Sequence, residues 1–147
     1  MQQFPKRKWP RLKEHDYSEE GFYFLTICTK GKKCLLSIIS AKPGETVLPR
    51  LTEYGRITEA FLKRIPGIDR YVIMPNHIHL IIHKTNGNPI SNDIRAFKGL
   101  VTKRIGFGIW QDYYYDHVIR DEADYRIKCN YIDENPAKWA EDAYFSP

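Results

Sequence analysis

The sequence predicts one α+β domain in which an antiparallel sheet carries helices packed mainly on one of its faces. Strand-like apolar runs at 22–29, 71–74 and 77–83 alternate with helical patterns at 52–65 and 91–106, and a further helical segment follows residue 121. The 147 residues fit a single domain, with a core over about 17–136 and a basic N-terminal arm over 1–16. This order of elements favours a ferredoxin-like core.

The first half of the chain supplies a buried strand and an amphipathic helix. Aromatic and β-branched residues over 22–29 predict the strand, and the turn-like run 30–33 closes it. Residues 34–39 could form its partner strand. From 52 to 65 apolar residues recur at helical spacing, and Pro66 with Gly67 ends that helix.

In the second half, the runs 71–74 and 77–83 are expected to be adjacent in one sheet. Ser91 offers an N-cap for a second helix, which should end near Gly106. Asp121, followed three residues later by Asp124, predicts the start of a last helix. That helix should end near residue 135, because a proline follows there.

Composition bounds the functional classes. Hydrophobic residues make up 42% and charged residues 28%, which is typical of soluble globular proteins, and no apolar run has the length of a membrane span. The N-terminus lacks the apolar stretch of a secretory signal, so a cytoplasmic location is expected. Cys28, Cys34 and Cys129 are widely spaced and predict reduced thiols. A formal charge of +5 favours a polyanionic partner such as nucleic acid.

The run 77–83 carries the first candidate site. On a strand, His77 and His79 share one face while Ile78 and Leu80 share the other. Their Cα atoms should lie roughly 6.6 Å apart, close enough for both imidazoles to bind one metal ion, whereas His83 should lie roughly 20 Å from His77. Two interpretations stay open at this point, a metal site and ordinary strand histidines.

A second candidate lies in residues 109–120, where three consecutive tyrosines at 113–115 stand beside Asp116, His117 and Arg120. Tyrosines often pack at sheet edges with the hydroxyl in water. Beside a metal ion, however, a tyrosine can attack a phosphodiester, because the metal polarises the phosphate and offsets the high pKa of the phenol, roughly 10. Mg²⁺ and Mn²⁺ are both plausible with imidazole ligands.

Three motifs occur in the order of a known family: Pro75-Asn76-His77-Ile78-His79, Trp110-Gln111-x-x-Tyr114-x-Asp116-His117-x-Ile119-Arg120, and Tyr131-Ile132-x-x-Asn135-Pro136. Nearly the whole chain resembles the REP-associated tyrosine transposases, relatives of the small insertion-sequence transposases with an HUH metal motif and one catalytic tyrosine. The resemblance implies an HUH (RRM-like) core. It also implies a single-strand DNA endonuclease and strand transferase that acts on hairpin-bearing, repetitive palindromic DNA through a covalent 5′-phosphotyrosine, with a divalent metal and without ATP.

The resemblance also implies roles for individual residues. His77 and His79 take the HUH positions, and Tyr114, three residues before His117, takes the position of the nucleophile. His117 can be a third metal ligand if residues 114–118 form a helical turn, but not if they form a strand, because the two side chains then diverge. Candidate DNA contacts are basic residues of the arm and of the second helix, with Lys98 favoured: Arg11, Lys13, Arg95, Lys98 and Lys103.

Two other functions stay open. The chain could be a non-catalytic nucleic-acid-binding module of the same fold, or a metal-dependent phosphodiesterase in which water attacks in place of tyrosine. The sequence leaves monomer and homodimer as alternatives.

Overall fold

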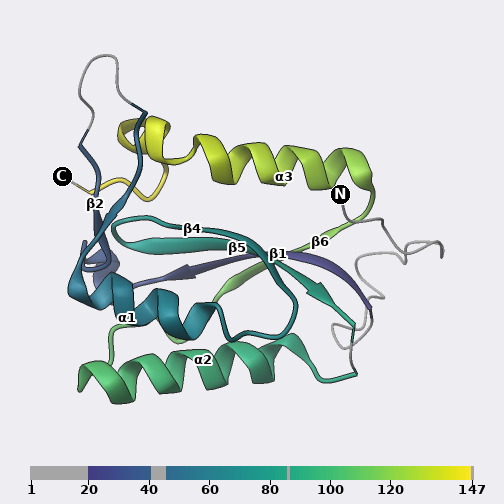
Figure 1. The fold of residues 1–147 in the computed structure, drawn as a ribbon, viewed down its shortest axis with the longest axis horizontal. Helices are drawn as coiled ribbons and strands as arrows, with labels where there is room; N and C mark the ends of the chain where they lie inside the picture. Colours follow the sequence, from purple (N-terminus) through teal and green to yellow (C-terminus); the bar gives the residue numbers. More distant parts are fainter. Residues whose placement is uncertain (1–19, 41–45, 86, 147) are drawn as a thin grey trace.

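The computed structural model describes residues 20–40, 46–85 and 87–146 (Figure 1). The expected basic arm, with Arg11 and Lys13, lies outside these residues. Four strands form the main sheet, in the order β4-β5-β1-β6, and each neighbouring pair is antiparallel. Their bounds are Gly21–Cys28 for β1, Ile68–Ile73 for β4, His77–Lys84 for β5 and Tyr115–Ile119 for β6.

Helices join and cover these strands. In chain order they are α1 (Glu53–Leu62), α2 (Ile90–Ile105), α3 (Glu122–Glu134) and the 3₁₀ segment η3 (Pro136–Glu141). The sequence of elements β1-α1-β4-β5-α2-β6 and the strand order together give the β-α-β-β-α-β arrangement of the ferredoxin-like fold. The expected α+β class with an antiparallel sheet is therefore confirmed.

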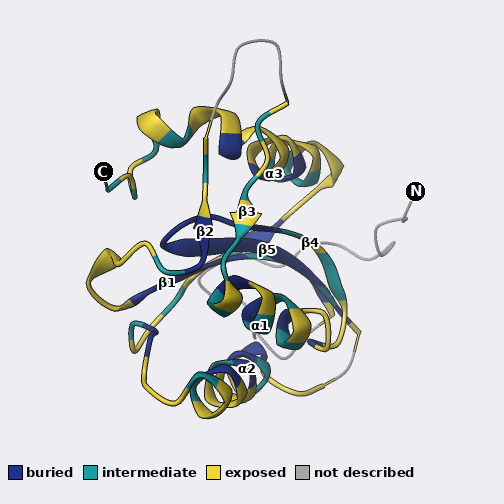
Figure 2. Cartoon of the chain, turned by 60° about the vertical axis from the view of Figure 1, so that its left-hand side comes forward, coloured by how far each residue is buried: buried dark blue, intermediate teal, exposed yellow. Residues whose placement is uncertain are grey.

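The two faces of the sheet are covered by different helices (Figure 1). Helices α1 and α2 pack on one face over a core that includes Leu25, Leu80 and Val118, and α3 packs on the other over Ile81 and Ile119. We call the second side, which also carries His77 and His79, the histidine face. Figure 2 shows the sheet buried between these layers while the outer sides of the helices are exposed.

Local sequence signals explain most of the helix ends. Thr52 caps α1 by accepting a hydrogen bond from the Gly55 amide. Asp121 caps α3 by accepting one from the Asp124 amide, as the sequence predicts. Helix α2 ends at Gly106, whose φ of 102° suits glycine. Its start differs from the prediction, because the N-cap position is Pro89 and Ser91 lies inside the helix.

The predicted pairing of residues 34–39 with the first strand is wrong. Strand β2 (Ser37–Ile38) pairs with β3 (Arg50–Leu51) in a separate two-stranded sheet, while both edges of β1 are taken by β5 and β6. The intervening turn η2 (Lys30–Lys32) carries the chain away from the main sheet.

The three cysteines are free; Cys28 and Cys129 are buried, and Cys34 is exposed. Among the residues that the structure describes, none of the helices combines the length and the apolar character needed to cross a bilayer.

Candidate functional site

His77 and His79 lie on β5, which is an inner strand of the sheet, opposite Cys28 and Thr26 of β1. Their imidazole rings are 4.6 Å apart between centroids, and the residues are 0% and 2% exposed. The alternation predicted from the sequence holds, since Ile78 and Leu80 belong to the core on the opposite face. The strand therefore presents two imidazoles at one buried position.

Hydrogen bonds fix the orientation of His77. Asn76 Nδ2 donates to the carbonyl oxygens of Lys32 (3.2 Å) and Tyr144 (2.7 Å), so Asn76 Oδ1 faces His77 Nδ1 at 2.8 Å. Because an amide oxygen can only accept, His77 Nδ1 is the protonated nitrogen. Its Nε2 keeps a lone pair, and this atom is buried without a hydrogen-bond partner.

His79 is held in the same manner. Its Nδ1 lies 2.8 Å from the hydroxyl of Thr26, the cross-strand partner, and its Nε2 is likewise buried without a hydrogen-bond partner. Two orphaned ring nitrogens beside each other are costly unless something binds them. Histidines that ligate metals commonly engage the second ring nitrogen in this way, which fixes the tautomer and the ring orientation.

A carboxylate completes the group. Asp142 follows η3, and its Oδ2 lies 3.7 Å from His77 Nε2. The Asn135 side chain donates to the same oxygen (2.7 Å), and the Tyr144 amide donates to Oδ1 (2.8 Å). One ligand atom each from His77, His79 and Asp142 lie within 4.8 Å of one another. Two imidazoles and a carboxylate are suitable ligands for a divalent ion.

Burial keeps both imidazoles neutral. It lowers the pKa of His77 to about 4, although the nearby Asp142 carboxylate acts in the opposite direction. Burial also lowers the pKa of His79 well below its usual value, and the neighbouring His77 adds to this effect. Only a neutral imidazole can bind a metal through its lone pair, so the pair stays in its ligand form at neutral pH.

Two tyrosines contact the pair. Tyr131 projects from α3 with its ring 5.0 Å from that of His79, and it remains 43% exposed. Tyr144 lies 4.5 Å from the His77 ring, and burial raises its pKa to about 12. Burial and the negative charge of Asp142 raise the pKa of Tyr131. The hydroxyl of Tyr131 is therefore protonated at neutral pH.

Tyr114 lies elsewhere. It precedes β6 and packs against the core cluster on the α1–α2 side of the sheet, beside Lys98, whose Nζ lies 5.9 Å from the ring centroid. The structure thus does not bring Tyr114 to the histidine pair. Tyr113 and Tyr115 pack against each other at the exposed start of β6, with ring centroids 5.7 Å apart.

His117 also lies apart from the group. Residues 115–119 form strand β6, which is the alternative in which His117 was expected not to join the metal. Its Nε2 lies 2.8 Å from Asp124 Oδ2, and the side chain is 39% exposed. The group formed by His77, His79 and Asp142 does not include it.

The basic residues of α2 differ in their surroundings. Lys98 is half-buried and donates to the carbonyl oxygens of Gln111 (2.8 Å) and Tyr113 (3.3 Å), so its ammonium already holds the turn before β6. Burial lowers its pKa. Arg95 and Lys103 are exposed on the same helix.

Sequence reasoning missed Tyr131, Asn135 and Asp142 as site residues. A signal for the first two is present, because residues four apart on a helix share a face, and Tyr131 and Asn135 belong to one predicted helix. Asp142 has no such signal, since it reaches the site only through the fold of the segment after η3.

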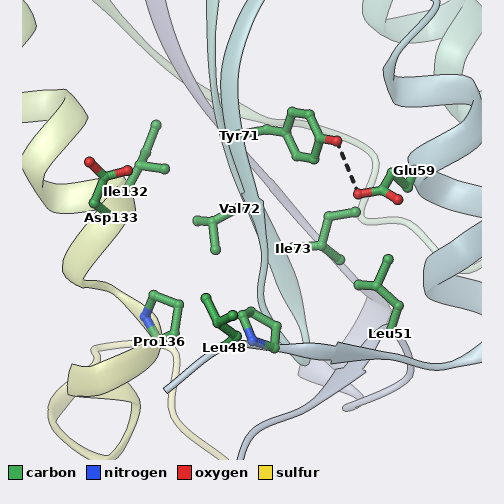
Figure 3. A pocket seen from close by; sticks show the side chains of 10 residues that line it. Leu48, Leu51, Glu59, Tyr71, Val72, Ile73, Ile132, Asp133 and Pro136 are labelled. Carbon is green, nitrogen blue, oxygen red and sulfur yellow. Dashed lines mark hydrogen bonds between the residues drawn. The ribbon is translucent and has the colours of Figure 1, made fainter. Parts of the chain in front are cut away.

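A separate cavity of about 490 Å³ straddles the edge strand β4 (Figure 3). Tyr71 and Ile73 line one side of it, and Val72 faces Ile132 on the other. The carboxylate of Glu59, which also lines the cavity, accepts a hydrogen bond from the Tyr71 hydroxyl at 3.0 Å. The lining is mostly apolar and excludes the histidine pair.

Comparison with known proteins identifies the family. No family model matches the chain. An uncharacterised protein of Haemophilus influenzae is 33% identical over 95% of this chain and 93% of its own length. The REP-associated tyrosine transposase of Escherichia coli K12 is 33% identical over 83% of this chain and 70% of its own length.

The fold agrees with that relationship. The solved structure of a REP-associated tyrosine transposase bound to a REP hairpin superposes with a TM-score of 0.66, at 24% identity, over 85% of this chain and 72% of that one. The sequence relationship, the shared fold and the order of the motifs agree. The chain belongs to the family of REP-associated tyrosine transposases.

Proposed function

We propose that this protein cleaves and rejoins single-stranded DNA through a covalent 5′-phosphotyrosine, and that Tyr131 is the nucleophile. The observation that carries the proposal is the contact between the Tyr131 ring and His79, 5.0 Å apart, on the face where three ligand atoms converge. Tyr131 replaces Tyr114 in this role because Tyr114 packs on the other side of the sheet. A nucleophile must lie within reach of the groups that activate it.

His77, His79 and Asp142 would hold the divalent metal. A bound ion would draw charge from the phosphate oxygens and so make phosphorus more open to attack. Manganese accepts imidazole ligands more readily than magnesium does, so we expect Mn²⁺ to support the reaction well. Thr26 and Asn76 would serve to orient the two imidazoles.

The reaction balances without a further substrate. A bond forms between the Tyr131 hydroxyl oxygen and phosphorus, and the bond between phosphorus and the 3′ oxygen breaks. The phenolic proton is released and the leaving oxygen takes up a proton, which gives a free 3′-OH. Attack by another 3′-OH reverses the sequence and restores the tyrosine, so the energy of the phosphodiester is retained in the enzyme-DNA bond.

The partner we propose is single-stranded DNA that carries a hairpin. The solved relative that shares the fold is bound to a REP hairpin, and the positive charge of this chain suits a polyanion. Arg95 and Lys103 remain candidate phosphate contacts, as do Arg11 and Lys13 of the arm. Lys98 is a weaker candidate, because it donates to two backbone carbonyls. A cytoplasmic location suits this substrate.

The test is adduct formation on a labelled hairpin-bearing single strand with Mn²⁺, analysed by denaturing gel electrophoresis. We expect the wild type and Tyr114→Phe to form a denaturation-resistant adduct, and Tyr131→Phe to form none. Cleavage that survives in Tyr131→Phe without an adduct would indicate attack by water. Binding without cleavage by the wild type would indicate a nucleic-acid-binding module.

A further inference from the structure

We propose that Lys32 and Lys128 are phosphate anchors at the two ends of a track for single-stranded DNA across the histidine face. This inference rests on the proposed function and deepens it, because it names the residues that hold the strand on either side of the reaction centre. The track is a row of side chains in successive contact, with an ammonium group at each end.

Ring contacts connect the two lysines. Lys32 Nζ lies 5.9 Å from the Tyr144 ring centroid, and Tyr144 lies 4.5 Å from His77. His77 lies 4.6 Å from His79, which stacks against Phe24 at 5.3 Å. Lys128 Nζ then lies 5.8 Å from the Phe24 centroid. Each member of the row thus contacts the next one.

The register of β1 places Lys32 and Lys128 on opposite sides of the histidine pair. On β1, Thr26 is paired with His79 and Cys28 with His77. Phe24 precedes these positions, and the turn with Lys32 follows them. At roughly 3.3 Å per residue, Phe24 and Cys28 are about 13 Å apart along the strand. A DNA strand aligned with β1 would therefore meet one lysine before the histidine pair and the other after it.

Lys32 is fixed to the histidine pair through its backbone. Its carbonyl accepts a hydrogen bond from Asn76, the residue that also orients His77. Its φ of 55° is uncommon for a residue with a side chain, and it is the only such non-glycine residue in the described ranges. The side chain is exposed. Backbone strain of this kind is often retained at functional sites.

Lys128 is placed by a polar cluster on the other side. It lies four residues after Asp124 on α3, with Nζ 3.4 Å from Asp124 Oδ1, and its side chain is 23% exposed. The other carboxylate oxygen of Asp124 contacts His117 at 2.8 Å. Lys128 also precedes Tyr131 by three residues, so both project from one side of the helix toward Phe24.

The charges and rings of this row suit a single strand better than a duplex. Proteins that bind single strands combine cationic groups for the phosphates with aromatic rings for unstacked bases. Tyr144, Tyr131 and Phe24 supply rings, and the lysines supply cations. The carboxylates on the row are Asp124, which lies between Lys128 and His117, and Asp142, which belongs to the proposed metal group. The row therefore keeps cations at both ends.

The test measures how binding depends on salt, in a Tyr131→Phe background, which the proposed function expects to form no adduct. Fluorescence anisotropy with a labelled, hairpin-free oligonucleotide gives the affinity at several salt concentrations. Each phosphate contact on a single strand contributes about 0.7 to the slope of log K against log salt. We expect Lys32→Ala and Lys128→Ala each to reduce the slope by about 0.7, and the double variant by about twice as much.

Lys63→Ala is the matched control. Lys63 forms an i,i+4 pair with Glu59, as Lys128 does with Asp124, but it lies on the other side of the sheet. It should keep the parental slope. A normal slope in either Lys32→Ala or Lys128→Ala would overturn the two-ended track. Lys→Arg variants at the same positions, which preserve charge, should restore the slope and exclude a folding defect.

Two separate measurements distinguish this inference from the proposed function. Adduct formation by the wild type reports on the chemistry, whereas the slope reports only on phosphate contacts. Reduced slopes together with no adduct would refute the proposed function and support the track. Normal slopes together with an adduct would refute the track alone.

Discussion

Tyr131 on α3 and His79 on β5 meet across the histidine face, with ring centroids 5.0 Å apart and ring planes inclined at 62°. Strand β5 presents the imidazole, and α3 places the phenol above it because its N-cap at Asp121 and its buried residues Cys129 and Ile132 fix the rotation of the helix. The same rotation brings Asn135, one turn later, to Asp142. A single helix thus positions both the proposed nucleophile and the support for the carboxylate.

Removing the Asp142 charge should weaken metal binding. We expect Asp142→Asn to lower Mn²⁺ affinity by at least tenfold in isothermal titration calorimetry, because an amide is a poorer ligand than a carboxylate. Asp133→Asn is the control, since Asp133 is exposed on α3 and lies outside the group. Equal affinity of Asp142→Asn and wild type would remove Asp142 from the site.

The Thr26 hydroxyl should support metal binding, because it orients the imidazole of His79. Thr26→Val keeps the shape of the side chain but leaves His79 Nδ1 without its partner at 2.8 Å. Loss of such a supporting hydrogen bond typically lowers metal affinity about 10- to 100-fold. We expect a decrease in this range by calorimetry. Thr102→Val is the control, because Thr102 lies on α2 and outside the histidine group. It should bind Mn²⁺ as the wild type does, and the same result for Thr26→Val would contradict the proposed role.

The free energy of unfolding of the metal-free protein should decrease as the pH is lowered. The folded-state pKa of His77 is about 4, and that of His79 is also lowered, whereas unfolded histidine has a pKa of 6.5. Below pH 6.5 the unfolded chain takes up protons that the folded chain does not, so stability is complete above 6.5 and decreases toward about 4. At pH 5 the lowered pKa of His77 decreases the free energy of unfolding by about 2 kcal/mol.

Urea unfolding in the presence of a chelator, at pH 7.5 and pH 5.0, measures this decrease. Acidic residues add their own pH dependence, so the relevant comparison is with His77→Gln/His79→Gln. We expect a smaller decrease in the variant. An equal decrease in both proteins would show that the imidazoles are not kept neutral by burial.

His117 should be dispensable for metal binding. Its ring contacts Asp124 and lies outside the group of His77, His79 and Asp142. We expect His117→Gln to retain wild-type Mn²⁺ affinity and to lose less than about 1 kcal/mol of stability, because the pair with Asp124 is partly exposed. A tenfold loss of Mn²⁺ affinity in His117→Gln would show that His117 is a metal ligand.

The sequence predicts the scaffold of the site well. Alternation in β5 places His77 and His79 on one face, and the capping signal at Asp121 predicts where α3 begins. These features are local, because they depend on side chains a few residues apart. The histidine pair could therefore be identified before the structure was known.

The partners of the pair depend on packing between distant segments. The motif around Tyr114 and His117 suggested a nucleophile, but Tyr114 packs under α2 and His117 lies on an outer strand of the sheet. Asp142 arrives from a turn that follows η3, and the expected core boundary near residue 136 stops short of it. Sequence spacing carries no information on which face of the sheet such a segment covers.

In the mechanism that we propose, Tyr131 forms the covalent bond with DNA. The most direct measurement is mass spectrometry of tryptic peptides after the wild-type protein has reacted with a hairpin-bearing single strand and Mn²⁺. Trypsin separates the candidates, because Tyr131 lies in the peptide 129–138 and Tyr114 in the peptide 105–120. We predict the nucleotide adduct on peptide 129–138. An adduct on peptide 105–120 would show that Tyr131 is not the nucleophile.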